Sequence, residues 1–185
     1  NTVYISLTYA FLTVVLELLL GLAIALLLQR PSRFNNIASI LLLLPLMTAP
    51  ALAALMWKLM THPDFGVLSY LLSVMGIQNF KWASDPDTAL FTVVLVDMWV
   101  YTPFIMILLL AGLRSLPKAP FEAAALDGVP RSFVFFRITL PMLMPYIITA
   151  ALFPMLDSIQ QFDIVYAMTQ GGPGNATLLF QVQAY

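Results

Sequence analysis

The chain of 185 residues has no cysteine, a single histidine and few charges of either sign. Without cysteine there is no disulfide, no thiolate nucleophile and no cysteine-ligated metal. The lone histidine, His62, supplies neither a histidine cluster for zinc nor a histidine-containing catalytic triad. A net charge of −1 without a basic run gives no general attraction to nucleic acid. We therefore expect no catalytic residue, no metal, no cofactor and no nucleic-acid partner.

A phosphate-binding loop is also missing. The glycine-rich stretch from Gly171 to Gly174 reads GGPG and lacks the lysine and the serine or threonine that such a loop needs. These residues are typical of a turn. We expect the chain not to bind ATP itself, so any ATP hydrolysis belongs to another subunit.

What the chain does have is apolar sequence: 61% of its residues are hydrophobic and only 9% are charged, with a mean hydropathy of +0.92. This composition is typical of a protein in a lipid bilayer. Four apolar runs are long enough to cross it, at residues 3–28, 37–60, 90–113 and 138–156. The sequence therefore predicts an all-α, polytopic transmembrane helical bundle forming one domain over residues 1–185, in which Pro45 and Pro50 kink the second span.

The basic residues predict the orientation. Six of the eight lysines and arginines fall between the first and second runs or between the third and fourth, namely Arg30, Arg33, Arg114, Lys118, Arg131 and Arg137. By the positive-inside rule, loops 29–36 and 114–137 are expected to be cytoplasmic. Residues 61–88 and both chain ends then face outward, and we expect a short interfacial helix around Tyr70–Met75.

The polar interruption at residues 122–141 predicts a helix, a sharp turn and a second helix. Pro117 and Pro120 suit a helix start, and Glu122 falls in the first turn, where the helix dipole favours a carboxylate. Gly128 can adopt the left-handed conformation that ends a helix, and Pro130 follows it. The second segment, amphipathic and rich in phenylalanine, is expected at the membrane surface.

This interruption also carries a spaced pattern. Glu122-Ala123-Ala124 is followed by three residues, Gly128, nine residues, Ile138, one residue and Leu140-Pro141. The pattern resembles the cytoplasmic signature loop of inner-membrane permeases from binding-protein-dependent ABC importers. The likeness extends over nearly the whole chain. The run QGGPG at 170–174 is similar to a marker of the sugar-transporting branch (maltose, lactose and glycerol-3-phosphate permeases), although that branch often has glycine where Gln170 stands.

The resemblance implies how the loop works and with what. In the family, a short helix docks on a cytoplasmic ATPase. Glu122 would meet a basic or amide group there, Ala123 and Ala124 would keep the contact face small, and Gly128 would set the turn. Ile138, Leu140 and Pro141 would fix the join to the next span, and Asp127 would either take part or only cap and pair locally.

Implied partners are ATPase subunits, a second permease subunit, an external solute-binding protein and the lipid of the inner or plasma membrane. Because family permeases have about six core spans, this chain is expected to be a piece of a longer permease.

Polar residues inside the spans are candidates for a substrate path, because intramembrane polar groups usually face a bundle interior or a pathway. Their helical spacing places them on shared faces of two spans. The candidates are Asp97, Tyr101, Phe104, Pro154, Asp157, Ser158 and Gln161. Carboxylates, amides and hydroxyls suit the hydroxyls of a polyol and aromatic rings suit its apolar face, but interhelical hydrogen bonds and core packing account for these residues equally well. Glu17 either pairs within the bundle, lies near the outer interface or faces the path.

Other functions remain open at this point. An ion-coupled secondary transporter or channel would use Glu17, Asp97 and Asp157 as ion or proton sites. A permease for a non-sugar solute, such as an amino acid, a polyamine or a phosphorylated polyol, would share the same signature loop. A membrane scaffold that transports nothing would have no ATPase partner.

Overall fold

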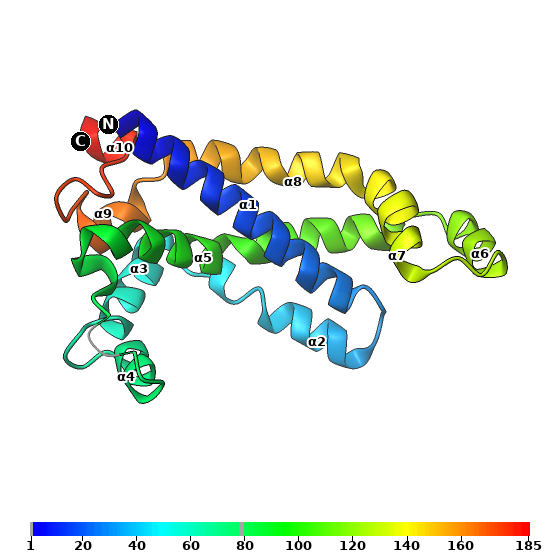
Figure 1. Cartoon of the computed structure of the whole chain (residues 1–185), viewed down its shortest axis with the longest axis horizontal. Coiled ribbons are helices and arrows are strands. Elements are labelled where there is room, and N and C mark those ends of the chain that lie inside the picture. The colour runs from blue at the N-terminus through cyan, green and yellow to red at the C-terminus, as the bar shows by residue number, and fades with distance from the viewer. Residues whose placement is uncertain (1, 78–79) are drawn as a thin grey trace.

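A computed structural model describes residues 2–77 and 80–185, and these residues form helices and turns without a β-strand. The architecture rests on long helices that lie alongside one another (Figure 1). They are α1 (Thr2–Leu28), α5 (Pro86–Ser115) and α8 (Leu140–Gln160). Each is long and apolar enough to cross a membrane. The predicted all-α transmembrane bundle is confirmed.

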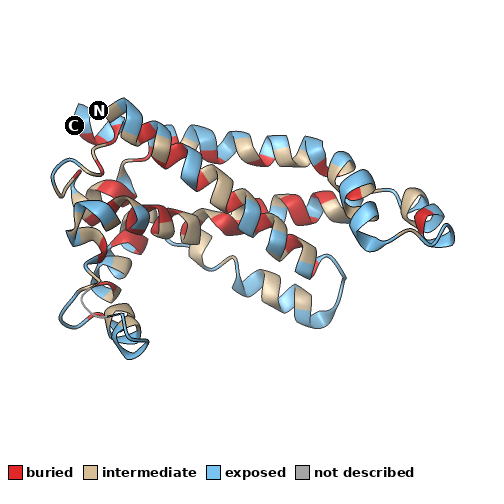
Figure 2. Ribbon diagram, in the orientation of Figure 1, coloured by how far each residue is buried: buried red, intermediate tan, exposed pale blue. Residues whose placement is uncertain are grey.

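The central helix is α5. Within the most apolar part of each long helix, 61% of the α5 residues are buried, against 28% for α1 and 22% for the span that contains α8. Figure 2 shows the same contrast along the bundle. The helix begins at a sequence-encoded cap, where the Asp85 side chain accepts a hydrogen bond of 3.1 Å from the backbone N–H of Asp87. Because α1 and α8 bury a smaller share of their residues than α5 does, they keep exposed apolar faces that suit contact with lipid.

Two glycines let the long helices approach closely. A Cβ atom at Gly21 of α1 would lie 2.6 Å from the Cγ2 atom of Ile105 in α5. A Cβ atom at Gly112 of α5 would lie 2.6 Å from the ring of Tyr146 in α8. Small residues permit such contacts between membrane helices. Gly21 and Ala25 lie one turn apart in α1 and are both buried.

The second apolar run is not one kinked helix. It consists of α2 (Arg33–Leu41), the 3-10 turn η1 (Pro45–Met47) and α3 (Pro50–Met60), and the chain bends by 95° between the two halves. Proline disfavours helical geometry in the residue before it, and Ala49, which precedes Pro50, is extended with ψ 133°. Proline therefore divides the predicted span of 37–60 into a bent pair instead of kinking it.

Short elements cover the end of the bundle where both termini lie (Figure 1). They are α4 (Val67–Val74), the 3-10 turn η2 (Trp82–Ser84), α9 (Asp163–Thr169) and α10 (Phe180–Ala184). Helix α9 buries Ile164 and Val165 in a hydrophobic cluster with residues of α3 and α5. The backbone N–H of Phe180 donates a 3.1 Å hydrogen bond to Ser6 Oγ, which joins α10 to α1. The expected short helix around Tyr70–Met75 is present as α4.

The opposite end carries α6 (Ala119–Leu126), α7 (Arg131–Val134) and the π-helical turn η3 (Phe135–Thr139). Helix α6 projects beyond the bundle (Figure 1). From Arg131 the helix runs through η3 into α8, so the fourth spanning helix covers Arg131–Gln160 instead of starting near residue 138. The segment expected as a separate surface helix is the first part of this span.

Candidate functional site

Helix α6 holds the first residues of the predicted coupling segment. Pro120 lies in its first turn, as does Glu122, and Ala124 is the one residue that the helix buries. Glu122, Ala123 and Asp127 are exposed, and Leu126 keeps 90% of its surface accessible. The outer face of α6 therefore carries exposed charged and apolar side chains that are free to contact another molecule.

A glycine turn ends α6. Gly128 has φ +65°, in the left-handed region that favours glycine. Its N–H donates to the carbonyl of Ala125 over 3.3 Å, and the N–H of Val129 donates to the carbonyl of Ala124 over 3.3 Å. This pair of bonds is the Schellman motif. The helix, sharp glycine turn and second helix expected from the sequence are present.

The last residues of the predicted segment lie where η3 passes into α8. Proline at 141 has no N–H to continue the ordinary helical bonds, and the helix widens just before it. There the N–H of Leu140 donates to the carbonyl of Phe135, five residues back. Ile138 and Leu140 are half-buried at this junction, whereas Glu122 and Ala123 of α6 are exposed.

The two basic loops lie at the same end of the bundle. A guanidinium nitrogen of Arg114, at the end of α5, donates a 3.1 Å hydrogen bond to the carbonyl of Leu28, the last residue of α1. A cation is favourable at the carbonyl end of a helix. This bond holds the connection after α1 next to the connection that carries α6.

A second region of interest is an open cleft of about 430 Å³ between α1, η1, α5 and α8. It is lined by Glu17, Leu46, Tyr101, Phe104, Ile105, Phe153, Pro154, Leu156, Asp157 and Gln160. The structure thus brings together Tyr101, Phe104, Pro154 and Asp157 from the predicted substrate-path residues. The Phe104 and Phe153 rings meet edge to face at 5.5 Å.

The other candidates lie behind the cleft. Gln161 Nε2 donates a 2.8 Å hydrogen bond to Asp97 Oδ1, which joins the end of α8 to α5. Ser158 and Thr13 share a 2.9 Å hydrogen bond that joins α8 to α1. Asp97, Ser158 and Gln161 are all buried. In this conformation their polar groups serve interhelical hydrogen bonds, the alternative that the sequence left open.

Glu17, for which the sequence left three positions open, lies in the lining of the cleft. Its side chain is fully buried, it lines the cleft, and neither carboxyl oxygen has a hydrogen-bond partner among the described residues. Its carboxyl group lies close enough to Asp97 and Asp157 to interact electrostatically with both. Glu17 is also the only charged residue of the first apolar run, which is the signal that singles it out in the sequence.

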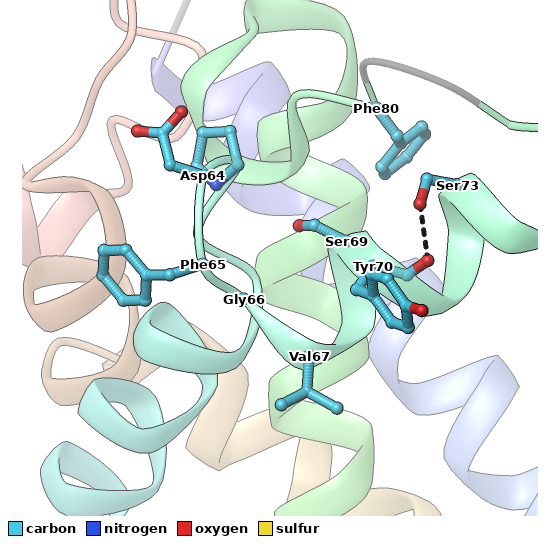
Figure 3. Close-up of a pocket in the computed structure, with 9 residues that line it drawn as sticks. Asp64, Phe65, Gly66, Val67, Ser69, Tyr70, Ser73 and Phe80 are labelled. Carbon is cyan, nitrogen blue, oxygen red and sulfur yellow. Dashed lines mark hydrogen bonds between the residues drawn. The ribbon is translucent and has the colours of Figure 1, made fainter.

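A further open cavity, of about 580 Å³, lies at the end with the termini, around α4 and the turn before it. Figure 3 shows Asp64, Ser69, Tyr70 and Phe80 around this space. The ring of His62 stacks on Phe65 with centroids 3.9 Å apart, and Trp82 Nε1 donates a 3.0 Å hydrogen bond to Ser69 Oγ. The sequence predicts only that residues 61–88 face outward and contain a short helix, and it gives no sign of this cavity.

Comparison with known proteins identifies relatives along almost the whole chain. Residues 6–184 match the family model of the binding-protein-dependent transport system inner membrane component. The trehalose/maltose transport system permease protein MalF of Thermococcus litoralis is 35% identical over 182 residues, covering 98% of this chain and 62% of the relative. The sulfoquinovosyl glycerol transport system permease protein SmoG of Agrobacterium fabrum is 36% identical over 177 residues, covering 96% and 56%.

The fold has a solved counterpart. A chain in the crystal structure of a bacterial alginate ABC transporter, in complex with an alginate pentasaccharide-bound periplasmic protein, superposes with a TM-score of 0.81 at 20% identity. The match covers 94% of this chain and 61% of that chain. The present chain thus spans 62% and 56% of the length of the two named relatives.

Proposed function

This chain belongs to the family of binding-protein-dependent transport system inner membrane components, and from that premise we propose that it forms part of the membrane path of an ATP-driven importer. The permease would take a small solute from an external binding protein and pass it between two permease subunits. Cytoplasmic ATPase subunits would supply the energy through residues 122–141. The segment between the third and fourth spans is thus the site of coupling.

The single observation that carries this proposal is the geometry of α6. It is a short helix that projects from the bundle, is ended by a left-handed glycine and exposes Glu122 and Leu126. Arg114 and Arg131 flank it, which favours a cytoplasmic position by the positive-inside rule. A projecting helix with little packing of its own is well placed to enter a groove on a partner.

A sugar or polyol is the proposed cargo. Relatives at 35% and 36% identity carry names that include trehalose, maltose and sulfoquinovosyl glycerol. The cleft suits such a solute, because Glu17, Asp157 and Gln160 offer hydrogen-bonding groups beside the aromatic pair of Phe104 and Phe153. Sugars bind through the same combination of polar groups at their hydroxyls and apolar surface against their rings.

The test is capture of the ATPase by the full-length permease. Glu122→Lys reverses a charge that is exposed in the first turn of α6, so it should weaken ATPase capture and ATP-driven uptake while the permease stays folded. Asp87→Lys is the matched control, because Asp87 is an exposed carboxylate in the first turn of α5, at the opposite end of the bundle. It should leave ATPase capture unchanged.

Two results would contradict the proposal. In the first, the wild-type permease captures no ATPase, or Glu122→Lys captures as much as wild type. In the second, proteoliposomes take up solute in response to a proton or sodium gradient without ATP. That result would favour the ion-coupled alternative, in which Glu17, Asp97 and Asp157 serve as ion sites.

A further inference from the structure

The cleft between α1, η1, α5 and α8 is lined by acidic and uncharged polar groups but by no basic group. Two carboxyl groups line it, from Glu17 and Asp157, together with the Tyr101 side chain and the amide of Gln160. The other lining residues are apolar, and no lysine, arginine or histidine is among them. Asp97, packed behind the cleft, adds a third carboxyl group within electrostatic range of Glu17. The cleft therefore offers nothing of positive charge to a bound solute.

Glu17 is the lining residue of this cleft whose buried polar atoms have no partner among the described residues. It is fully buried and lines the cleft, yet both of its carboxyl oxygens lack a hydrogen-bond partner among the described residues. Buried polar groups are costly when they make no hydrogen bond. Asp97 has no such need, because Gln161 already donates to it over 2.8 Å. The open hydrogen-bonding capacity of the cleft is thus concentrated at Glu17.

We propose that this cleft is an electronegative, polyol-binding site that accepts uncharged sugars and excludes anionic ones, with Glu17 as a specificity-determining residue. The inference rests on the proposed function and narrows its substrate class. A carboxyl group exchanges hydrogen bonds with sugar hydroxyls in either protonation state. In neither state does it neutralise a phosphate, sulfonate or uronate group brought out of water.

None of the basic residues of the chain lines the cleft. Arg114 is bound to the carbonyl of Leu28 at the α6 end of the bundle, whereas Lys58 Nζ donates to the carbonyl of Ala167 over 3.2 Å at the other end. Neither lines the cleft. From this chain, an anionic solute at Tyr101 and Phe104 would meet carboxyl groups, uncharged polar groups and apolar walls, without a basic group.

The electrostatic part of the inference can be measured directly, because the chain has no native cysteine. Gln160→Cys places one thiol in the cleft. In the assembled transporter, its rates of reaction with a cationic and an anionic methanethiosulfonate of similar size are compared, with labelling read on this chain by mass spectrometry. Asn36→Cys is the control, an exposed position one turn after Arg33 in α2, at a basic end of the molecule.

We expect the ratio of cationic to anionic rates to be at least about tenfold higher at residue 160 than at residue 36, because nearby carboxylates attract one reagent and repel the other. Asp157→Asn should lower the ratio at residue 160 and leave it unchanged at residue 36. Equal ratios at the two positions, or a ratio at residue 160 that does not change in Asp157→Asn, would overturn the inference. A basic side chain of the second permease subunit that reaches Glu17 would give that result.

Uptake into proteoliposomes that contain the complete transporter and its binding protein tests the selectivity. Matched pairs of solutes share a skeleton and differ in charge: glucose with glucuronate, and glycerol with glycerol 3-phosphate. ATP-driven accumulation of an anionic member at the rate of its uncharged counterpart would overturn the inference and leave the proposed function intact. If the ATPase-capture test fails, the proposed function fails, and the reagent ratios still decide whether the cleft is electronegative.

Discussion

Individual residues in this chain are held by specific partners, and Gln161 is the clearest case. Its amide donates a 2.8 Å hydrogen bond to the Asp97 carboxyl, and both side chains are buried. Gln161→Leu should lower the free energy of unfolding by about 1–3 kcal/mol, because a buried acceptor is left without its donor. Gln160→Leu, one residue earlier and exposed, should change it little. Thermal unfolding of the full permease in lipid nanodiscs compares the two, and equal stability would contradict the assignment.

A smaller effect is expected where α1 meets α8. Thr13 and Ser158 share a hydrogen bond of 2.9 Å between buried hydroxyls. A double-mutant cycle with Thr13→Val and Ser158→Ala should give a coupling energy of about 0.6 kcal/mol, the mean for hydrogen bonds between membrane helices. The energies come from reversible unfolding in bicelles. Strictly additive single substitutions would show that the two hydroxyls do not stabilise the interface together.

At the scale of whole helices, glycine allows the closest approach between α1 and α5. At Gly21 the backbone of α1 approaches α5 so closely that a Cβ atom would lie 3.2 Å from the backbone nitrogen of Met106. Gly21→Val should therefore push the two helices apart and destabilise the permease by about 1–3 kcal/mol through overpacking. Ala23→Val, on the exposed side of the same helix, should be nearly neutral. Equal loss of thermal stability in both variants would contradict this close packing.

The turn after α6 supports a different prediction, because Gly128 has open space around its Cβ position and only its positive φ restricts substitution. Gly128→Val should loosen the end of α6 by strain of about 1–3 kcal/mol. Gly128→Asn should keep the turn, since asparagine tolerates the left-handed region. Hydrogen exchange over residues 119–130 measures the loosening, and ATPase capture should fall with it. Equal exchange in the two variants would show that the left-handed turn does not hold α6 in place.

An element can be predicted from the sequence when residues within or beside it determine its structure. The apolar runs determine α1, α5 and the part of the last spanning helix after residue 138, and the pattern of Pro120, Glu122 and Gly128 determines α6 with its turn. The 95° bend of the second run is not determined locally, because a proline in an apolar run is compatible with either a kink or a break. Contacts of α3 with α9, far along the chain, accompany the break that occurs.

The residues of the cleft could likewise be predicted only in part from the sequence. Helical spacing correctly places Tyr101 and Phe104 together, but it does not reveal that Asp97 is turned away toward Gln161. Nor does spacing show that Glu17, from a different helix, meets them, since this depends on how closely α1 packs at Gly21. Distances between helices are set by such contacts. Which of these residues bind solute, and which residues of the loop bind an ATPase, stay predictions.

At the scale of the whole molecule, the two basic loops predict one orientation. Single cysteines at Asn36 and Ser132 should react with a membrane-impermeant maleimide only from the cytoplasmic side, and one at Ser73 of α4 only from outside. All three positions are exposed. Labelling of intact cells against inverted membrane vesicles measures this, and the absence of native cysteine keeps the background of this chain at zero. Reversed accessibility at any two positions would contradict the orientation.

Helix α6 is attached to the bundle by two short connections and buries only Ala124. Those connections lead to α5 and to the helix that continues into α8, and these two helices also provide most of the cleft lining. By helical rise, Tyr101 lies about 21 Å from the end of α5 at Ser115. A tilt of about 5° over that length moves a side chain by about 2 Å. We therefore expect a partner that moves α6 to change the width of the cleft, because the two helices joined to α6 carry most of its lining.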